Sequence, residues 1–280
     1  MKRAAALLVL AVCLLSCGSP PPAAPSTTPP QGLTVSLAQG RSDMPKHILS
    51  VVVANSASTP VWVSDVRLSG PSFKQVGFER MDTFVKNVPV AMRIPYGEAA
   101  CDQEAVPPLR PSAVVAHVRV GDEAPREVRW PLPDTEPLLG KLLREECEAF
   151  LIKQVVDIGF GTAWTEKEKV LHGSVIVARR SGDHTVTIKE LLGNVHYRLA
   201  GDPVTLKPGE TRLEIPVRIT PDRCDPHAFA EAKIAMLFSA RVSLGEGEPR
   251  FVGFRSDTVQ TPGGRLDEVI LTYARKTCGL

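Results

Sequence analysis

The sequence lacks an excess of charge of either sign. It holds 33 lysines and arginines against 31 aspartates and glutamates. If Lys2 and Arg3 leave with an N-terminal signal, as argued below, the side chains of the mature protein sum to a net charge of zero. A nucleic-acid-binding protein carries a basic excess or a basic stripe on one face. We therefore expect no nucleic-acid partner and no partner that is selected by charge.

The sequence also lacks the common catalytic and metal-binding motifs. Gly-x-Ser-x-Gly, Ser-x-x-Lys, His-Glu-x-x-His and phosphate-cradling glycine loops do not occur after the signal. No Cys-x-x-Cys pair, the usual spacing of zinc-binding thiolates, is present. We expect neither an enzyme nor a cofactor. A wall-modifying enzyme whose active site is assembled across strands is the alternative.

Long apolar runs are absent except at the N-terminus. Lys2 and Arg3 precede an apolar run from Ala4 to Leu15. This run is about a dozen residues long, whereas a membrane-spanning helix needs roughly 20. Basic, apolar and small residues in this order are typical of a secretory signal. We expect residues 1–16 to be removed.

The segment Leu14-Leu15-Ser16-Cys17 resembles the lipobox of bacterial lipoproteins. An apolar residue lies three positions before the cysteine and a small one directly before it, although Leu15 is bulkier than the family usually has. The resemblance implies a diacylglycerol on the Cys17 sulfur, cleavage before Cys17, and acylation of the new amine. Several acyl chains make a lasting anchor. The expected location is the outer face of the cell membrane; an ordinary signal-peptidase site is the alternative.

Proline dominates the stretch after the cysteine. Six prolines lie between residues 18 and 31, at positions 20, 21, 22, 25, 29 and 30. Such a segment buries no apolar area and favours an extended polyproline conformation. We expect residues 17–32 to form a lipidated stalk that lifts the body off the lipid surface.

Beyond the stalk, apolar and polar residues alternate in short runs that are rich in β-branched side chains. Alternation bounded by turn residues predicts strands, and no helical crossovers separate them. The pattern predicts an all-β body of two tandem immunoglobulin-like β-sandwich modules, residues 33–147 and 148–280. The expected strands are 33–37, 47–53, 61–68, 84–94, 114–120, 128–130, 155–162, 170–178, 185–192, 211–220, 235–244 and 250–254.

The two halves repeat one plan. Gly70 precedes Cys101 by 31 residues, and Gly193 precedes Cys224 by 31 residues. A single offset of 123 links both pairs. We infer one ancestral module that was duplicated.

Each half ends in a short segment with helical spacing of apolar residues. In the first, residues 138–147, Thr135 is the expected N-cap and Pro137 lies in the first turn. In the second, residues 266–278, Gly279 is the expected stop. A closing strand over residues 269–273 is the alternative, but the match between the two ends favours a helix.

Four cysteines remain after the lipidated one, and they allow three disulfide pairings. The repeat selects Cys101 with Cys147 and Cys224 with Cys278, because each pair joins a strand end to the terminal helix of its own module. Thiolate binding of zinc or copper is the alternative.

Asp225, His227 and Glu231 are the strongest candidates for a metal-binding site. On a helix, His227 and Glu231 lie one turn apart on one face and, with a third ligand, would hold a divalent metal. Asp225 before Pro226 is also a good N-cap and first-turn pair. We favour this structural interpretation because it explains more of the residues.

The tryptophans and the other histidines carry weaker signals. Trp62, Trp130 and Trp164 lie on or beside expected strands, so we expect them in the core, with an exposed sugar-stacking platform as the alternative. The scattered histidines are expected to be ordinary strand or loop residues. These are His47, His117, His172, His184 and His196.

Three segments together resemble a family of uncharacterised secreted proteins and lipoproteins of actinobacteria. They are RCDPHAFAEAK at 223–233, RIPYG at 93–97, and the closing Cys278-Gly279. The resemblance covers most of the mature chain and implies no activity. The family has Glu-Asp-Lys where this chain has Glu231-Ala232-Lys233, which weakens the metal hypothesis.

The favoured function is a non-enzymatic cell-envelope lipoprotein that presents a binding or structural surface outside the membrane. Its expected partners are the membrane, through the lipid, and another envelope protein or a wall component. The alternative is a small-ligand or metal-binding lipoprotein that uses the cleft between the modules, with His227 and Glu231 as its best candidates. The first predicts an exposed apolar patch, and the second a polar pocket at the junction.

Overall fold

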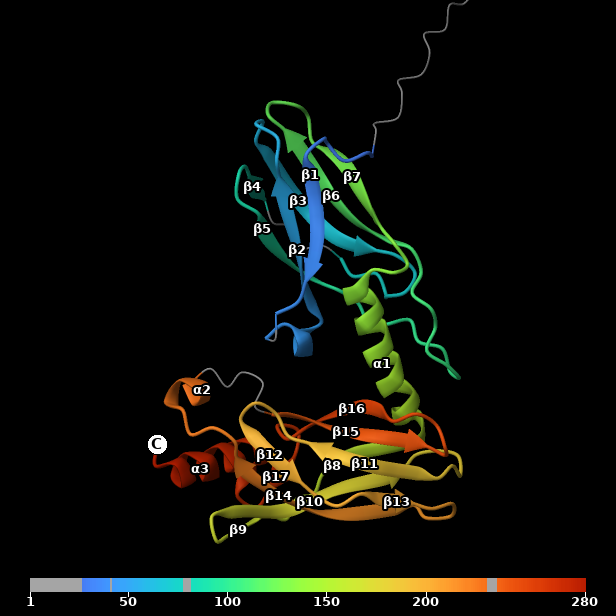
Figure 1. The fold of residues 1–280 in the computed structure, drawn as a ribbon, viewed down its shortest axis with the longest axis vertical. Coiled ribbons are helices and arrows are strands. Elements are labelled where there is room, and N and C mark those ends of the chain that lie inside the picture. Colours follow the sequence, from blue (N-terminus) through green and yellow to red (C-terminus); the bar gives the residue numbers. More distant parts are fainter. Residues whose placement is uncertain (1–26, 41, 78–81, 231–235) are drawn as a thin grey trace, which may run out of the picture.

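The computed structural model describes residues 27–40, 42–77, 82–230 and 236–280. They form two β-sandwiches joined by one helix, α1 (Pro137–Val155) (Figure 1). Each sandwich has its own apolar core. The expected all-β, immunoglobulin-like fold is confirmed. The signal, Cys17 and most of the expected stalk lie outside the described residues.

Module 1 consists of two packed antiparallel sheets. One has the strand order β1-β2-β5 and the other β4-β3-β6-β7. Burial alternates along β2, because successive side chains of a strand point to opposite faces. The strands are β1 (Leu33–Ala38), β2 (Ile48–Asn55), β3 (Val61–Ser69), β4 (Thr83–Val85), β5 (Val90–Pro95), β6 (Ser112–Val120) and β7 (Arg126–Leu132), with a 3-10 turn, η1, at Met44–Lys46.

Module 2 repeats this strand order. Its sheet β8-β10-β14 corresponds to β1-β2-β5, with β12 added beyond β14 and β9 paired to β10; its sheet β13-β11-β15-β16 corresponds to β4-β3-β6-β7. The internal repeat inferred from the offset therefore extends to the topology. The strands are β8 (Val156–Phe160), β9 (Thr165–Lys167), β10 (Val170–Arg179), β11 (Val186–Leu192), β12 (Tyr197–Ala200), β13 (Val204–Leu206), β14 (Arg212–Pro221), β15 (Leu237–Leu244), β16 (Arg250–Arg255), β17 (Gln260–Thr261) and β18 (Gly264–Arg265).

Helices α2 (Pro226–Ala230) and α3 (Leu266–Cys278) belong to module 2. Helix α3 contains residues 269–273, so the alternative of a closing strand there is wrong. Gly279 ends α3 in the left-handed conformation, at φ 70°, as expected. No helix in the described part of the chain is both long and apolar enough to span a membrane.

Helix α1 is longer than the expected terminal helix. The helix is 19 residues long and continues past Cys147 to Val155. Leu139 and Leu143 are buried in the core of module 1, and Ile152 is buried in that of module 2. No glycine or proline lies between Leu143 and Ile152, so nothing ends the helix at Cys147. The boundary expected between residues 147 and 148 therefore falls inside a helix that both modules share.

The body also begins earlier than residue 33. The carbonyl oxygen of Thr27 accepts a hydrogen bond from the backbone N–H of Arg129 at 2.8 Å, and that of Thr28 accepts one from the Arg126 guanidinium at 2.9 Å. Strand β7 is an edge strand, whose outward N–H groups need acceptors. Residues 27–32 therefore belong to module 1 and not to the stalk.

Both expected disulfides are present. Cys101 bonds to Cys147 in α1, and Cys224 bonds to Cys278 in α3. Each joins the loop that follows the third strand of one sheet, β5 or β14, to a helix. The expected pairing is confirmed.

The cap of α1 gives a test with a matched control. The Glu136 carboxylate accepts a hydrogen bond from the Leu139 N–H, so Glu136 is the N-cap, and the expectation for Thr135 is wrong. Glu136→Ala should lower the free energy of unfolding by about 1 kcal/mol in urea titrations. Thr135→Ala should leave it nearly unchanged. Equal losses in the two variants would contradict this assignment.

Candidate functional site

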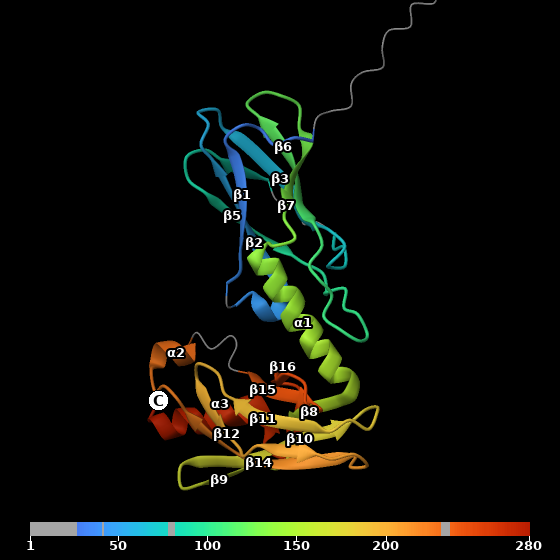
Figure 2. The same cartoon turned by 45° about the vertical axis from the view of Figure 1, so that its right-hand side comes forward.

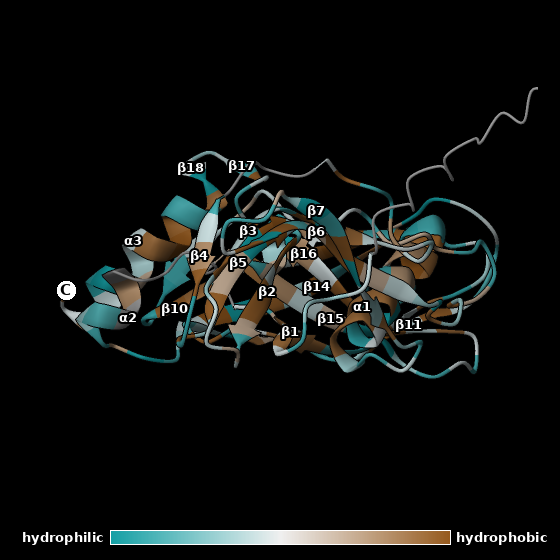
Figure 3. Ribbon diagram, turned by 90° about the horizontal axis from the view of Figure 1, so that it is seen from above, coloured by the Kyte–Doolittle hydropathy of each residue, from teal (hydrophilic) through white to brown (hydrophobic). Residues whose placement is uncertain are grey.

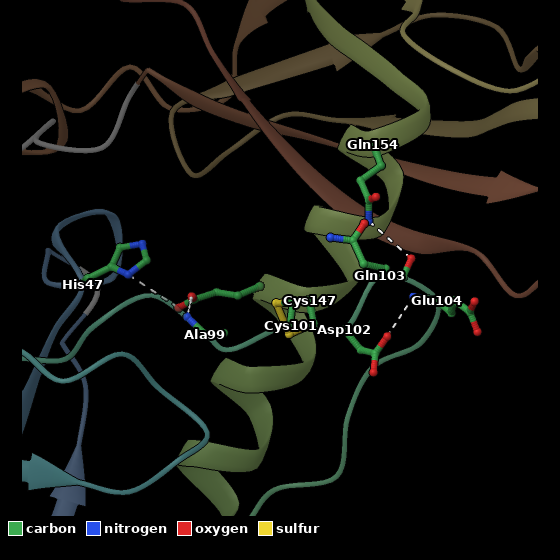
Figure 4. The surroundings of a disulfide bond; sticks show 9 residues. His47, Ala99, Cys101, Asp102, Gln103, Glu104, Cys147 and Gln154 are labelled. Carbon is green, nitrogen blue, oxygen red and sulfur yellow. Dashed lines mark hydrogen bonds and ion pairs between the residues drawn. A yellow bond between two sulfur atoms is a disulfide. The ribbon is translucent and has the colours of Figure 1, made fainter.

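The junction between the modules is built around the Cys101–Cys147 disulfide, in which Cys147 is fully buried and Cys101 is partly buried (Figure 4). The disulfide holds the loop after β5 against the middle of α1. About two helical turns beyond Cys147, the Gln154 side chain donates to the carbonyl oxygen of Gln103 at 3.4 Å. The Asp102 carboxylate accepts from the Glu104 N–H at 3.2 Å and shapes the loop tip. This loop is the part of module 1 that reaches toward module 2.

The segment leading to Cys101 is anchored by Tyr96, which is buried. Its ring lies against Phe73, with centroids 5.6 Å apart, and stacks on His47 at 5.2 Å. Burial, and secondarily the charge of Glu146, raises the pKa of the Tyr96 phenol. At Gly97, a Cβ would lie 1.9 Å from the backbone oxygen of Lys74, so only glycine fits.

Glu146 ties the same segment to α1. Its carboxylate accepts from the Ala99 N–H at 2.9 Å and lies 3.6 Å from the His47 ring nitrogen Nδ1 (Figure 4). Together with Tyr96 and Gly97, this contact gives the 93–97 motif a structural role, because it positions Cys101 next to α1. His47 is a loop residue, as expected, in the turn between η1 and β2, and it lies at this contact.

A cleft of about 400 Å³ lies where the modules meet. Module 1 contributes the loop of Gln103 and Glu104, α1 contributes its last two turns, and module 2 contributes two turns at the near end of its sandwich. Leu151, Val155 and Leu244 supply apolar surface. The polar and charged lining residues are Gln103, Glu104, Gln154, Ser181, His184 and Arg250. Such a mixture of apolar surface with a few converging polar groups is suited to a small polar ligand.

The metal candidates do not form a site in the described part of the chain. The Asp225 carboxylate accepts from the His227 N–H at 2.9 Å, so it caps α2 as the structural interpretation predicted. Both residues are exposed, and neither lines the cleft. Glu231 lies outside the described residues. Among the residues that are described, no group of three or more His, Cys, Asp or Glu side chains is placed to hold a metal. His227 therefore does not lie at the cleft, where the alternative hypothesis placed it.

The three tryptophans differ in their surroundings. Trp130 is buried, and its indole N–H donates to the Leu33 carbonyl oxygen at 3.2 Å. Trp164 packs partly buried against the core of module 2 and covers Gly173. Trp62 instead points outward from β3, so the expected core position is wrong for this residue. Its neighbours in the sequence, Val61 and Val63, take the inward positions.

His196 is a buried residue that no sequence pattern indicated. It is 7% exposed and packs against Tyr197 and against Phe229 of α2. Its ring nitrogen Nδ1 has no hydrogen-bond partner among the described residues. Burial, and secondarily the positive charge of Arg223, lowers the pKa of His196.

The burial of His196 predicts that module 2 is less stable at acidic pH. In the unfolded chain the imidazole takes up a proton near pH 6.5. The folded protein resists protonation until lower pH, so the free energy of unfolding should fall as pH drops below about 6.5. His196→Phe should reduce the slope of this free energy against pH between 5 and 7. The exposed His172 is the control: His172→Phe should keep the wild-type slope, and equal slopes in all three proteins would contradict the prediction.

Comparison with known proteins assigns no family. No protein-family model and no curated protein matches the chain. A solved protein of unknown function from Porphyromonas gingivalis W83 is similar over 74% of this chain and 89% of its own, at 16% identity and a TM-score of 0.22. The calcium binding domain CBD12 of CALX1.1 is similar over 73% of this chain and 75% of its own, at 12% identity and a TM-score of 0.19. TM-scores this low support no conclusion about function.

Proposed function

We propose that the protein is a non-enzymatic, lipid-anchored protein of the cell envelope that presents a binding or structural surface away from the membrane. The observation that carries the proposal is the position of chain entry. The chain enters module 1 at the end far from α1 and module 2 (Figures 1 and 2). If Cys17 carries lipid, module 1 lies next to the membrane and module 2 projects outward.

The shared helix supports this presentation. Helix α1 packs into both cores and against β16, and the disulfide at Cys147 prevents it from separating from module 1. A flexible linker would let module 2 fold back toward the lipid. A continuous helix instead keeps it at a distance. The expected partner is another envelope protein or a wall component, bound through shape and hydrogen bonds, because the mature chain has no net charge.

Lipidation at Cys17 can be tested with a matched cysteine. In a bacterial host, Cys17→Ser should move the full-length protein from the membrane fraction to the soluble or secreted fraction. It should also remove the mass of the acyl chains, because no lipid can be attached. Cys13→Ser, a change within the expected signal, should leave both properties unchanged. Continued membrane retention of Cys17→Ser would refute the anchor.

A second function, binding of a small polar ligand, is favoured by the cleft at the junction. The cleft combines Arg250 and His184 of module 2 with Glu104 of module 1. A ligand held by both modules would stabilise their relative orientation. The proposal concerns the cleft residues only and not the exposed His227.

A thermal-shift screen of the wild type against small polar metabolites tests this second function. A true ligand at 100 times its Kd should stabilise the folded protein by about 2.7 kcal/mol. The increase in Tm should be lost in Arg250→Ala, which removes a charged cleft residue, and kept in His227→Ala. Absence of any stabilising compound, or an equal loss in both variants, would count against a ligand site in the cleft.

A further inference from the structure

Module 1 carries two prominent exposed apolar side chains close together in the sequence. Val88 is 72% exposed and Phe84 is 48% exposed. Phe84 lies on β4, and Val88 lies in the connection from β4 to β5, residues 86–89. Val88 is the most exposed of the large hydrophobic residues in the described part of the chain.

This connection lies at the end of module 1 where the chain enters. The strand register places Leu33 opposite Asn55, and Val53 opposite Val90. The Asn55 amide donates to the carbonyl oxygen of Val85, which directly precedes the connection, at 3.4 Å. The chain that arrives from Cys17 and the exposed Val88 are therefore at the same end, the one viewed from above in Figure 3.

Amphipathic side chains flank the apolar pair. The Trp62 and Phe84 rings lie directly across β3 and β4 with centroids 5.0 Å apart, and the Arg119 guanidinium lies 3.8 Å over the Trp62 ring. Tryptophan and arginine place an apolar body and a polar end at the boundary between lipid and water.

The internal repeat shows that the fold does not require this apolar surface. In module 2 the corresponding outward pair across β11 and β13 is Thr187 and Thr205, whose hydroxyls lie 3.2 Å apart. The corresponding connection, residues 207–211, is polar and exposed, with a hydrogen bond from the Lys207 N–H to Glu210 at 2.7 Å. Module 2 thus lacks an apolar surface at this position, and its own exposed aromatic residue, Phe251, lies on a different strand, β16.

The length of the tether is compatible with contact between this end and the lipid. Thr27, the first described residue and one that contacts module 1, lies ten positions after Cys17. A chain of this length reaches at most about 35 Å, and an extended segment that lies along the lipid surface, instead of standing upright on it, imposes no minimum distance. The end of module 1 can therefore approach the headgroups.

We propose that the chain-entry end of module 1 rests on the lipid surface, with Val88 and Phe84 at the boundary between headgroups and acyl chains. This inference rests on the proposed anchor at Cys17. Acidic Asp122 and Glu123, in the turn after β6 at the same end, offset Lys86. The contact should therefore form on uncharged phosphatidylcholine as well as on anionic lipid.

Depth-dependent quenching tests the contact in the full, lipidated protein. A polarity-sensitive fluorophore is attached at Val88→Cys, and in a separate variant at Thr211→Cys in the corresponding connection of module 2. In phosphatidylcholine vesicles that contain brominated lipid, we expect the probe at residue 88 to lose roughly half of its fluorescence, because bromines lie in the acyl region that it enters. The probe at residue 211 should be unaffected.

The outcomes separate this inference from the anchor itself. If the protein floats with the vesicles but neither probe is quenched, the anchor stands and the surface contact is refuted. If the protein does not float, the anchor fails and the contact fails with it. A probe at residue 88 that is shielded in cells but not quenched in pure lipid would show that a protein covers this surface, and would also overturn the inference.

Discussion

The architecture depends on one helix that contributes to two cores. Leu139 and Leu143 of α1 complete the core of module 1, and Ile152 completes that of module 2. Burying each such side chain contributes about 1.5–3 kcal/mol, so separating the helix from either module is costly. The fully buried Cys147 lies between these two groups of residues and is bonded to the loop at Cys101. Interface, disulfide and cleft therefore all depend on the position of α1.

The local alternation of apolar and polar residues made most of the fold predictable. The runs 33–37, 61–68 and 185–192 each became a strand, because the apolar side chains of each lie on one face and turn toward the core, although in 33–37 only Leu33 is fully buried. The run 84–94 became two strands, since residues 86–89 turn the chain between the sheets. Strands β9, β12 and β13 are only three or four residues long, too short to show a period. The shared helix was missed because nothing local distinguishes a helix that ends a module from one that enters the next.

The candidate site was much less predictable than the fold. The cleft brings together residues 103–104, 151–155, 181–184 and 244–250, which are far apart in the sequence and share no motif. Its existence depends on how two modules are oriented, which no local pattern encodes. In contrast, the preference for a helix cap over a metal ligand at Asp225 was correct, because a helix cap is a local interaction.

The repeat separates what the fold requires from what is particular to each module. Strand order and the disulfide to a helix occur in both modules, so they are requirements of the architecture. The Trp62–Phe84 pair occurs only in module 1, and His196 beneath α2 only in module 2. Exposed aromatic surface and a buried imidazole both cost stability in a solitary domain. Function specific to this protein is therefore to be sought at the Trp62–Phe84 surface, at His196, and at the junction between the modules.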